Sequence, residues 1–317
     1  MSSVTMNRPI RIAAISFTGK PEDATPENPY PTRTLEQMVE YVRLATNEGG
    51  RDVILLPEFW AGASVIEDLN GPIITTMSAL AKELGSYIIC PISRKTETVT
   101  KLNSAVIIGR HGEIAGIYDK NYPYWGEYDI APAPQAGSEL PVFDLDFGRV
   151  AIAICFDANF PHIWEEYGRK GAEIVFWPSA YSAGAQLQAH ALNNNYYIVS
   201  ANTAGTSLAY DINGECIMCE TAPEVNIANR TLDLDRGIYH NDFNLDLLPG
   251  LLEKHGGEIE VEKTMPLESW FILRSRDANV SARALAKEAG MKELQPYKFE
   301  SRARIDYYRE NGRFPAE

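Results

Sequence analysis

Residues 150–161 read VAIAICFDANFP, and this stretch decides the fold class. Its first half is an uninterrupted apolar run of valine, alanine and isoleucine, which is typical of a strand buried on both faces. Cys155 stands at the end of that run, and a short polar turn follows it. Pro161 then occupies a position that favours the first turn of a helix. A buried strand that turns directly into a helix is the repeating unit of α/β proteins, so the stretch predicts that class.

The same alternation extends in both directions along the chain. Apolar runs predict buried strands, and segments with apolar residues at helical spacing lie between them. The predicted strands are 10–17, 53–56, 87–92, 151–155, 173–177 and 197–201. The predicted helices are 32–47, 73–84, 161–170 and 185–194. Three hairpins interrupt the alternation, with turns at 110–113, near 146–148 and at 211–214, so mixed sheets are expected.

Two regions of different character divide the chain. No repeat, low-complexity tract or linker interrupts residues 9–238, so residues 1–240 are predicted to form one α/β domain. The pattern then becomes polar and irregular, with helices predicted at 281–289 and 300–310. Residues 241–317 are therefore interpreted as a C-terminal extension that packs on the domain or on a partner subunit.

Composition excludes several functional classes. With 317 residues and 45% hydrophobic content, the chain can bury a large core without disulfides. A net charge of -14 has the wrong sign for a nucleic-acid or anionic-membrane binder. No apolar run approaches the length of a membrane span, and the N-terminus lacks the features of a signal peptide. Four cysteines are too few for a disulfide framework, which favours reduced thiols and a cytoplasmic location.

The first stretch that carries chemistry is LLPEFW at 55–60, just past a predicted strand. A carboxylate held there in a semi-apolar setting has a raised pKa and is prepared to accept a proton. The alternative is an ordinary strand-end glutamate that points into solvent. Glu58 is therefore a candidate base only in combination with other residues.

The second stretch, YDKNYPYWGE at 118–127, ends a predicted hairpin strand at Lys120. A lysine there is suited to hydrogen-bond a developing oxyanion, and its charge is expected to lower the pKa of a nearby thiol. A surface lysine is the alternative. Tyrosine and tryptophan crowded beside lysine and glutamate are typical of small-molecule pockets, so Tyr124 and Trp125 are predicted to line one.

The third stretch is the opening one, and it presents Cys155 as a nucleophile. A strand, a sharp turn and a helix resemble the elbow that exposes catalytic nucleophiles, with backbone N–H groups turned toward the reacting atom. The alternative is a buried core cysteine, which is the commoner fate of that residue type. The position at the end of a strand weakens this alternative, because parallel strands of α/β proteins carry their sites at that edge.

These three stretches, in this order and at these separations, resemble the Glu, Lys and Cys motifs of the nitrilase superfamily, also called the carbon–nitrogen hydrolase family. The resemblance covers residues 9 to about 238. It implies an αββα sandwich that pairs into a homodimer or larger homo-oligomer, with Glu58, Lys120 and Cys155 converging in one pocket. Glu127 stands where many members carry a second glutamate near the lysine. Cys155-Phe156-Asp157 is more similar to the amidase and carbamoylase branches than to true nitrilases, which tend to carry Cys-Trp-Glu.

The expected reaction is hydrolysis of an amide or carbamoyl compound through a cysteine thioester. Glu58 and Lys120 are expected to favour the thiolate, and Lys120 and the Phe156 N–H to stabilise the oxyanion. Trp60, Tyr124 and Trp125 are predicted to flank the substrate, and Ser179 and Ala180 to contribute to its site. The predicted pocket loops contain no Lys or Arg, which favours a neutral or cationic substrate. These loops are 59–70, 121–136, 156–163, 178–190 and 202–209. No metal or organic cofactor is required.

Other functions stay open at this point. A nitrile would be attacked by the same thiol, and folds of this family also serve as non-catalytic binding or scaffold modules. A papain-like reaction is disfavoured, because none of the five histidines has an accompanying signature. Cys216 and Cys219 form a C-x-x-C pair, but no second pair accompanies it and its context is apolar and strand-like. The pair is therefore interpreted as part of a sheet rather than as a zinc or redox site.

Overall fold

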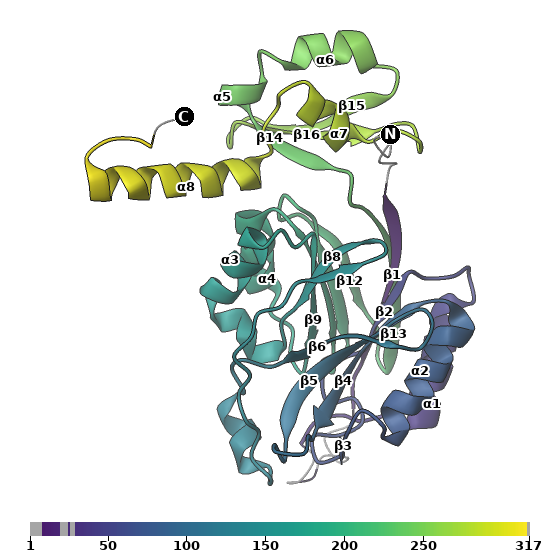
Figure 1. Ribbon diagram of the computed structural model, residues 1–317. Helices are drawn as coiled ribbons and strands as arrows, with labels where there is room; N and C mark the ends of the chain where they lie inside the picture. The colour runs from purple at the N-terminus through teal and green to yellow at the C-terminus, as the bar shows by residue number, and fades with distance from the viewer. Residues whose placement is uncertain (1–7, 20–24, 26–28, 316–317) are drawn as a thin grey trace. The chain divides into compact units, whose positions relative to one another are not determined.

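The computed structural model describes residues 8–19, 25 and 29–315. The chain divides into two compact units, Ile10–Leu232 and a smaller one made of Asp233–Glu317 with Met1–Pro9. Figure 1 shows both units, coloured along the chain. No helix in the described ranges is long and apolar enough to cross a bilayer.

The first sheet of the larger unit has the order β13-β1-β2-β4-β5-β6, and β3 pairs with β4 at the side. β1, β2 and β4 are parallel, and the hairpin strands β5 and β6 continue the sheet in antiparallel fashion. The strands are β1 (Pro9–Phe17), β2 (Val53–Leu55), β3 (Ile66–Glu67), β4 (Tyr87–Arg94), β5 (Leu102–Ile108), β6 (Ile114–Asp119) and β13 (Val225–Asp233). Helices α1 (Leu35–Thr46) and α2 (Pro72–Leu84) pack on one face of this sheet through one buried cluster.

The second sheet has the order β12-β11-β10-β9-β8-β7. Its strands are β7 (Phe143–Leu145), β8 (Gly148–Ile152), β9 (Ile174–Ser179), β10 (Tyr197–Asn202), β11 (Thr206–Tyr210) and β12 (Cys216–Thr221). Helices α3 (Pro161–Arg169) and α4 (Gly184–Asn194) cover one face through a second buried cluster, which includes Trp164, Trp177 and Leu187.

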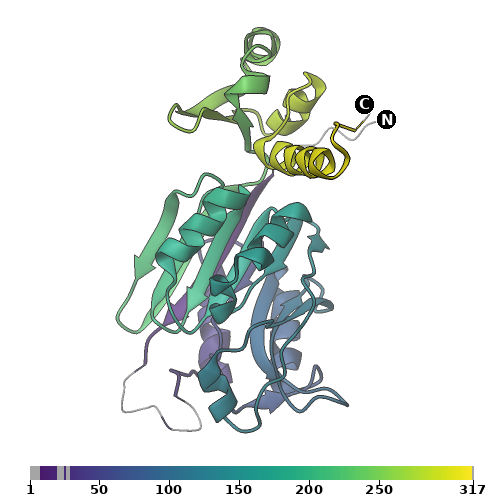
Figure 2. The same ribbon diagram turned by 90° about the vertical axis from the view of Figure 1, so that its left-hand side faces the viewer.

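The two sheets face each other at the centre of the larger unit. The Ser207 hydroxyl donates to the Ala14 carbonyl (3.2 Å) and lies 2.9 Å from the Ser16 hydroxyl oxygen. The Asn202 N–H donates to Ser16 Oγ as well, at 2.9 Å. The helices lie on the outer faces, as Figures 1 and 2 show. The predicted αββα sandwich is confirmed.

Local sequence signals account for some of the element boundaries. Thr34 caps α1 in a reciprocal capping box with Gln37, and Gly85 ends α2 in the left-handed conformation that glycine favours. The predicted hairpins and helices of residues 10–221 are all present within a few residues. One difference concerns the opening stretch: β8 ends at Ile152, and Cys155 begins a separate 3-10 turn, η3 (Cys155–Asn159).

The smaller unit contains strands that the sequence analysis did not predict. Its sheet has the order β14-β16-β15, formed by β14 (Gly237–His240), β15 (Ile259–Met265) and β16 (Trp270–Ser275). Its helices are α5 (Asn241–Asn244), α6 (Leu248–His255), α7 (Ala282–Glu288) and α8 (Leu294–Asn311). The expectation of irregular structure between 241 and 280 was therefore wrong. The signals were present but were not recognised, since β15 begins with the alternating sequence IEVE and β16 contains the apolar run WFIL.

Candidate active site

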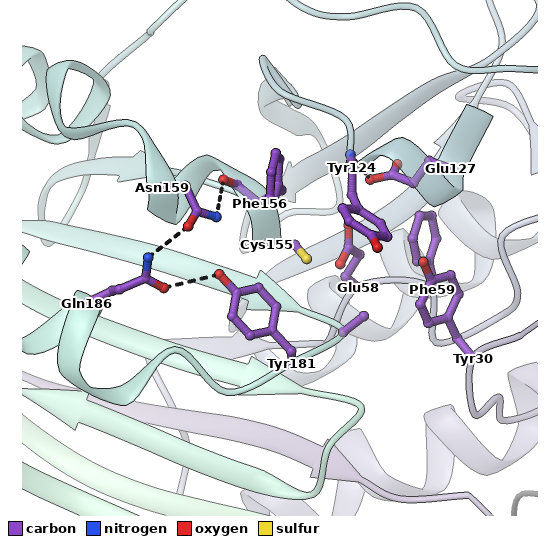
Figure 3. A pocket seen from close by; sticks show the side chains of 11 residues that line it. Tyr30, Glu58, Phe59, Tyr124, Glu127, Cys155, Phe156, Asn159, Tyr181 and Gln186 are labelled. Atoms are coloured by element: carbon purple, nitrogen blue, oxygen red, sulfur yellow. Dashed lines mark hydrogen bonds between the residues drawn. The ribbon is translucent and has the colours of Figure 1, made fainter. Parts of the chain in front are cut away.

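A cavity of about 420 Å³ opens in the larger unit beyond the ends of β2, β6, β8 and β9. It is mainly aromatic, with two carboxylates and one thiol in its wall. Figure 3 shows the lining residues: Tyr30, Glu58, Phe59, Tyr124, Glu127, Cys155, Phe156, Asn159, Ala180, Tyr181 and Gln186. The predicted candidates Glu58, Glu127 and Cys155 thus share one cavity.

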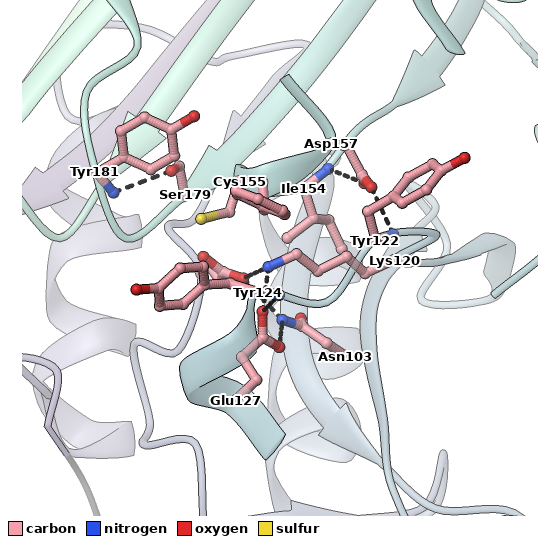
Figure 4. A network of polar contacts seen from close by, with 12 residues as sticks. Asn103, Lys120, Tyr122, Tyr124, Glu127, Ile154, Cys155, Asp157, Ser179 and Tyr181 are labelled. Atoms are coloured by element: carbon pink, nitrogen blue, oxygen red, sulfur yellow. Dashed lines mark hydrogen bonds and ion pairs between the residues drawn. The ribbon is translucent and has the colours of Figure 1, made fainter. Parts of the chain in front are cut away.

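Lys120 bridges the two carboxylates. Its ammonium group donates to Glu58 Oε1 at 2.8 Å and to Glu127 Oε1 at 2.5 Å. The Asn103 amide, on β5, also joins them, donating to Glu58 Oε1 (2.7 Å) and to Glu127 Oε2 (3.0 Å). All four side chains are buried, and Figure 4 shows the network. Two carboxylates share one ammonium group, so the network carries an excess of negative charge when all three groups are ionised.

The second carboxylate oxygen of Glu58, Oε2, is buried and has no hydrogen-bond partner among the described residues. Burial raises the pKa of Glu58, and the opposing charge of Lys120 reduces this effect without cancelling it. Burial lowers the pKa of Lys120, but the negative charges around it outweigh burial and raise that pKa well above its ordinary value. The site therefore holds a permanent cation beside a carboxylate that has one unoccupied oxygen.

The backbone at Cys155 adopts a conformation that is uncommon for a residue with a side chain. Its φ angle is +47°, at the first position of η3. The turn is held by hydrogen bonds from three aromatic ring nitrogens to three of its carbonyls. Trp177 donates to the Cys155 carbonyl (3.1 Å), Trp164 to that of Asp157 (3.1 Å), and His190 Nε2 to that of Ala158 (2.8 Å). These bonds come from β9, α3 and α4, so the surrounding core maintains the strained conformation that aims the thiol into the cavity.

Asp157 closes the same turn from inside. Its carboxylate accepts hydrogen bonds from the Tyr118 hydroxyl (2.7 Å), the Ile154 N–H (2.9 Å) and the Tyr122 N–H (2.9 Å). Complete burial raises the pKa of Asp157 to about 6, against the opposing effects of Lys120 and of these donors. The turn thus depends on a carboxylate that takes up a proton at a higher pH than an ordinary aspartate does.

We expect Asp157→Asn to reveal this titration as a pH-dependent difference in stability. Because the pKa is about 6 in the folded protein and lower in the unfolded chain, the carboxyl group favours folding when it is protonated. That contribution is complete below the unfolded pKa and is lost as pH rises through 6. The stability of the native protein relative to Asp157→Asn should therefore fall by up to about 3 kcal/mol between pH 4 and pH 7.5.

Urea unfolding of both proteins across this pH range measures the effect. The amide introduced by the substitution does not titrate, so the two stabilities are compared at each pH. A native advantage that grows with rising pH would show that the three hydrogen bonds to the carboxylate outweigh its burial.

Burial disfavours ionisation of the Cys155 thiol in the free site. Burial raises its pKa to about 12, and the charge of Glu58 acts in the same direction. Lys120 and hydrogen bonds from the Ala180 N–H and the Ser179 hydroxyl lower the pKa, but less. Lys120 thus acts on the thiol in the expected direction, whereas the charge of Glu58 raises the thiol pKa. Desolvation and the adjacent carboxylate exceed the influence of the single cation.

The predicted substrate residues divide into two groups. Tyr124, Phe156 and Ala180 line the cavity. Trp60 does not, because its side chain is fully buried in the cluster between the first sheet and its helices. Trp125 is 81% exposed and lies outside the cavity wall. Ser179 is also outside the wall, buried beside the thiol, where its hydroxyl accepts a hydrogen bond from the Tyr181 N–H at 3.0 Å.

Several residues of the site were missed from the sequence. Asn103 and Ser104 are the two polar residues of the buried strand β5, and a polar pair in such a run was the one available signal. Tyr30 stacks on Phe59 at 4.8 Å from a segment that showed no pattern. At the cavity wall, Gln186 Nε2 donates to Asn159 Oδ1 (2.8 Å), and the Tyr181 hydroxyl is 3.4 Å from Gln186 Oε1. No group of three or more His, Cys, Asp or Glu among the described residues is arranged to hold a metal ion.

Comparison with known proteins matches the same region of the chain. A family model for carbon–nitrogen hydrolases matches residues 23–238. A β-ureidopropionase of Arabidopsis thaliana is 28% identical over 56% of this chain, and the matched part spans 49% of that protein. A nitrilase of Pyrococcus abyssi is 28% identical over 68% of this chain and 89% of its own length. An N-carbamoylputrescine amidase of Solanum tuberosum is 26% identical over 64% of this chain and 73% of its own length.

Solved structures show the same fold at lower sequence identity. A carbon–nitrogen hydrolase from Helicobacter pylori superposes with a TM-score of 0.60 at 18% identity, covering 72% of this chain and 90% of its own. An amidase from Nesterenkonia superposes with a TM-score of 0.59 at 18% identity, covering 78% of this chain and 98% of its own. Both alignments leave part of the present chain unmatched.

Proposed function

The chain belongs to the carbon–nitrogen hydrolase family, and from this premise we propose that it hydrolyses a small neutral or cationic amide or carbamoyl compound through a Cys155 thioester. One observation carries the proposal. Glu58 and Cys155 line the same cavity, and Glu58 offers its buried Oε2 atom without a hydrogen-bond partner among the described residues. Because this carboxylate oxygen accepts no hydrogen bond in the free site, it is available to accept the proton of the thiol.

The first half-reaction transfers the acyl group to sulfur. The neutral thiol of Cys155 loses its proton to Glu58 Oε2 as sulfur attacks the carbonyl carbon, so no stable thiolate is needed beforehand. The negative charge on the carbonyl oxygen is stabilised by the Lys120 ammonium and the Phe156 N–H. The C–N bond then breaks, and Glu58 returns the proton to the leaving nitrogen. An amine or ammonia leaves, and the acyl group remains on Cys155.

The second half-reaction reverses these roles with water. Glu58 accepts a proton from water while the water oxygen attacks the thioester carbon. The C–S bond breaks, the thiol regains its proton, and the acid product leaves. Glu127 takes no proton in this scheme. Its contact with Lys120 at 2.5 Å keeps the ammonium group directed at the reacting oxygen.

The charge of the cavity supports the substrate class. Its described wall contains five aromatic rings and two carboxylates but no arginine or lysine, although Lys120 lies directly behind it. Aromatic faces and acidic groups attract cations, whereas a substrate carboxylate requires a basic partner. The relatives include N-carbamoylputrescine amidases, whose named substrate carries an amine. These features favour a neutral or cationic substrate.

The test is ammonia release from matched compounds of equal length. We expect hydrolysis of N-carbamoylputrescine or N-butylurea, and a kcat/KM lower by on the order of 100-fold when the same skeleton ends in a carboxylate, because of like-charge repulsion. Simple amides and nitriles complete the panel. A preference for the carboxylate compound would overturn the substrate class, and hydrolysis of nitriles alone would favour the nitrilase alternative.

The matched control is Glu58→Gln, which preserves shape and removes the proton acceptor. We expect kcat to fall by about 10³-fold for every substrate that the native protein hydrolyses. Equal activity in both proteins would contradict the role of Glu58, whichever substrate is preferred. If the native protein hydrolyses nothing in the panel, the proposal of a small amide substrate fails and a non-catalytic binding role gains support.

A further inference from the structure

Two cysteines outside the active site lie on β12, the edge strand of the second sheet. Cys216 and Cys219 are both free and exposed, whereas Cys90 and Cys155 are buried. In a regular strand, residues three apart point to opposite faces of the sheet. Their spacing alone therefore predicts two separate, unrelated thiols.

The register of the sheet changes this expectation. Cys216 pairs with Tyr210 and Cys219 pairs with Leu208 on β11, and an irregularity between these pairs leaves Ile217 without a partner. Tyr210 and Leu208 are two residues apart and belong to the same buried cluster on the helix side of the sheet. Directly paired residues of an antiparallel ladder point to the same face. The bulge at Ile217 therefore turns both thiols to one face.

The distance between these positions suits a cross-link. Cys216 and Cys219 pair with two residues of β11 that are only two positions apart. The Cα atoms of Cys216 and Cys219 are therefore separated by about the length of two strand residues, about 6.6 Å. A disulfide joins Cα atoms that are up to about 6.8 Å apart, so the pair lies near the upper end of the permitted range. A bond formed there is exposed, and exposed disulfides are more readily reduced again.

The electrostatics of the two sulfurs agrees with their proximity. Partial burial raises the pKa of Cys216, and the charge of Cys219 and a hydrogen bond to it contribute further. The Cys216 thiol also donates to the Met218 carbonyl at 3.3 Å. Both sulfurs influence Tyr210, whose pKa burial raises to about 12. The two thiols and the tyrosine thus form one cluster at the sheet edge.

We propose that Cys216 and Cys219 form a surface dithiol that closes reversibly to a disulfide in exchange with a small disulfide such as oxidised glutathione. One thiolate attacks a sulfur of the small disulfide and releases one molecule of its thiol. The second thiolate then attacks the mixed disulfide, forms the internal S–S bond and releases the other. The protein loses two protons and two electrons, and the small disulfide gains them as it becomes two molecules of thiol.

The sequence interpretation of this pair as part of a sheet remains correct, since both residues lie in β12. Its exclusion of a redox role rested on the lack of a second C-x-x-C pair and on the apolar, strand-like context. The bulge, which depends on pairing with β11, brings the two thiols to one face within that strand. Cys155 takes no part in this exchange, because it lies in the buried site of the larger unit at η3.

Peptide mapping of the full-length protein tests the proposal. The protein is incubated with oxidised glutathione, remaining thiols are alkylated under denaturing conditions, and the chain is cleaved with trypsin. Residues 171–230 contain no internal Lys or Arg and hold Cys216 and Cys219 as their sole cysteines. We expect this fragment to be unalkylated and lighter by two hydrogens, and a dithiol reductant to restore two alkylation sites. The Cys155 fragment, 150–169, should be alkylated throughout.

Two single variants provide the controls. Cys216→Ser and Cys219→Ser each leave one exposed thiol, so we expect their fragments to stop at the mixed disulfide and to carry one glutathione. In the native protein, a fragment that accumulates one or two glutathiones without an internal bond would overturn the proposal. So would a fragment that stays fully alkylated at every ratio of oxidised to reduced glutathione. Neither result bears on the proposed hydrolase activity.

Discussion

Replacing Cys155 with alanine is expected to abolish amide hydrolysis, with kcat lower by about 10⁴-fold or more. The reason is that the thioester route requires the sulfur atom of Cys155. Tyr30 and Tyr181 line the same cavity, but burial raises the pKa of each hydroxyl above its ordinary value. The measurement is ammonia release from the best substrate of the panel, under single-turnover and steady-state conditions.

Two comparisons separate chemistry from folding in this experiment. Cys155→Ala should keep its affinity for the substrate, because Glu58, Lys120 and the cavity wall remain in place. Cys216→Ser should hydrolyse the substrate at the native rate, since that thiol lies on β12 outside the cavity wall. A Cys155→Ala protein that folds and retains more than a few per cent of native activity would disprove the thioester mechanism.

Replacing Lys120 with methionine is expected to remove activity and to destabilise the larger unit. The ammonium group lies 2.8 Å from Glu58 and 2.5 Å from Glu127, and all three groups are buried. Without it, two carboxylates face each other in a desolvated site. Removing one partner from a buried ion pair costs about 3–5 kcal/mol, and the loss of oxyanion stabilisation lowers kcat by about 10²–10³-fold in addition. Urea unfolding and ammonia release measure the two effects.

A double variant distinguishes the structural loss from the catalytic one. Lys120→Met combined with Glu127→Gln leaves one buried carboxylate, so that we expect most of the stability to return. Activity should stay absent, because the oxyanion still lacks its cation. If the double variant regained activity, the role of Lys120 would be confined to neutralising Glu127. If Lys120→Met alone were as stable as the native protein, repulsion between Glu58 and Glu127 would have to be relieved in another way, by one proton shared between the two carboxylates.

The sequence by itself determined the local elements and the residue types that the candidate site brings together. Apolar periodicity, the Thr34 cap and the Gly85 stop depend on neighbours along the chain, so that they were legible without a structure. The same holds for the three motifs, since each follows the end of a strand. The predicted strand end at Cys155 was three residues too late, because the apolar run continues through residues that have already left the ladder.

Tertiary structure alone decided which groups meet and what charge they carry. Asn103 reaches Glu58 across 45 residues of sequence, and Trp60 turns into the core rather than into the cavity. The thiol pKa of about 12 reflects burial and a nearby carboxylate, and neither can be read from the residues flanking Cys155. Likewise, Cys216 and Cys219 share a face only because the register with β11 skips Ile217. Desolvation, charge coupling and strand register arise from packing between distant segments. They therefore cannot be predicted from the residues that flank each site residue along the chain.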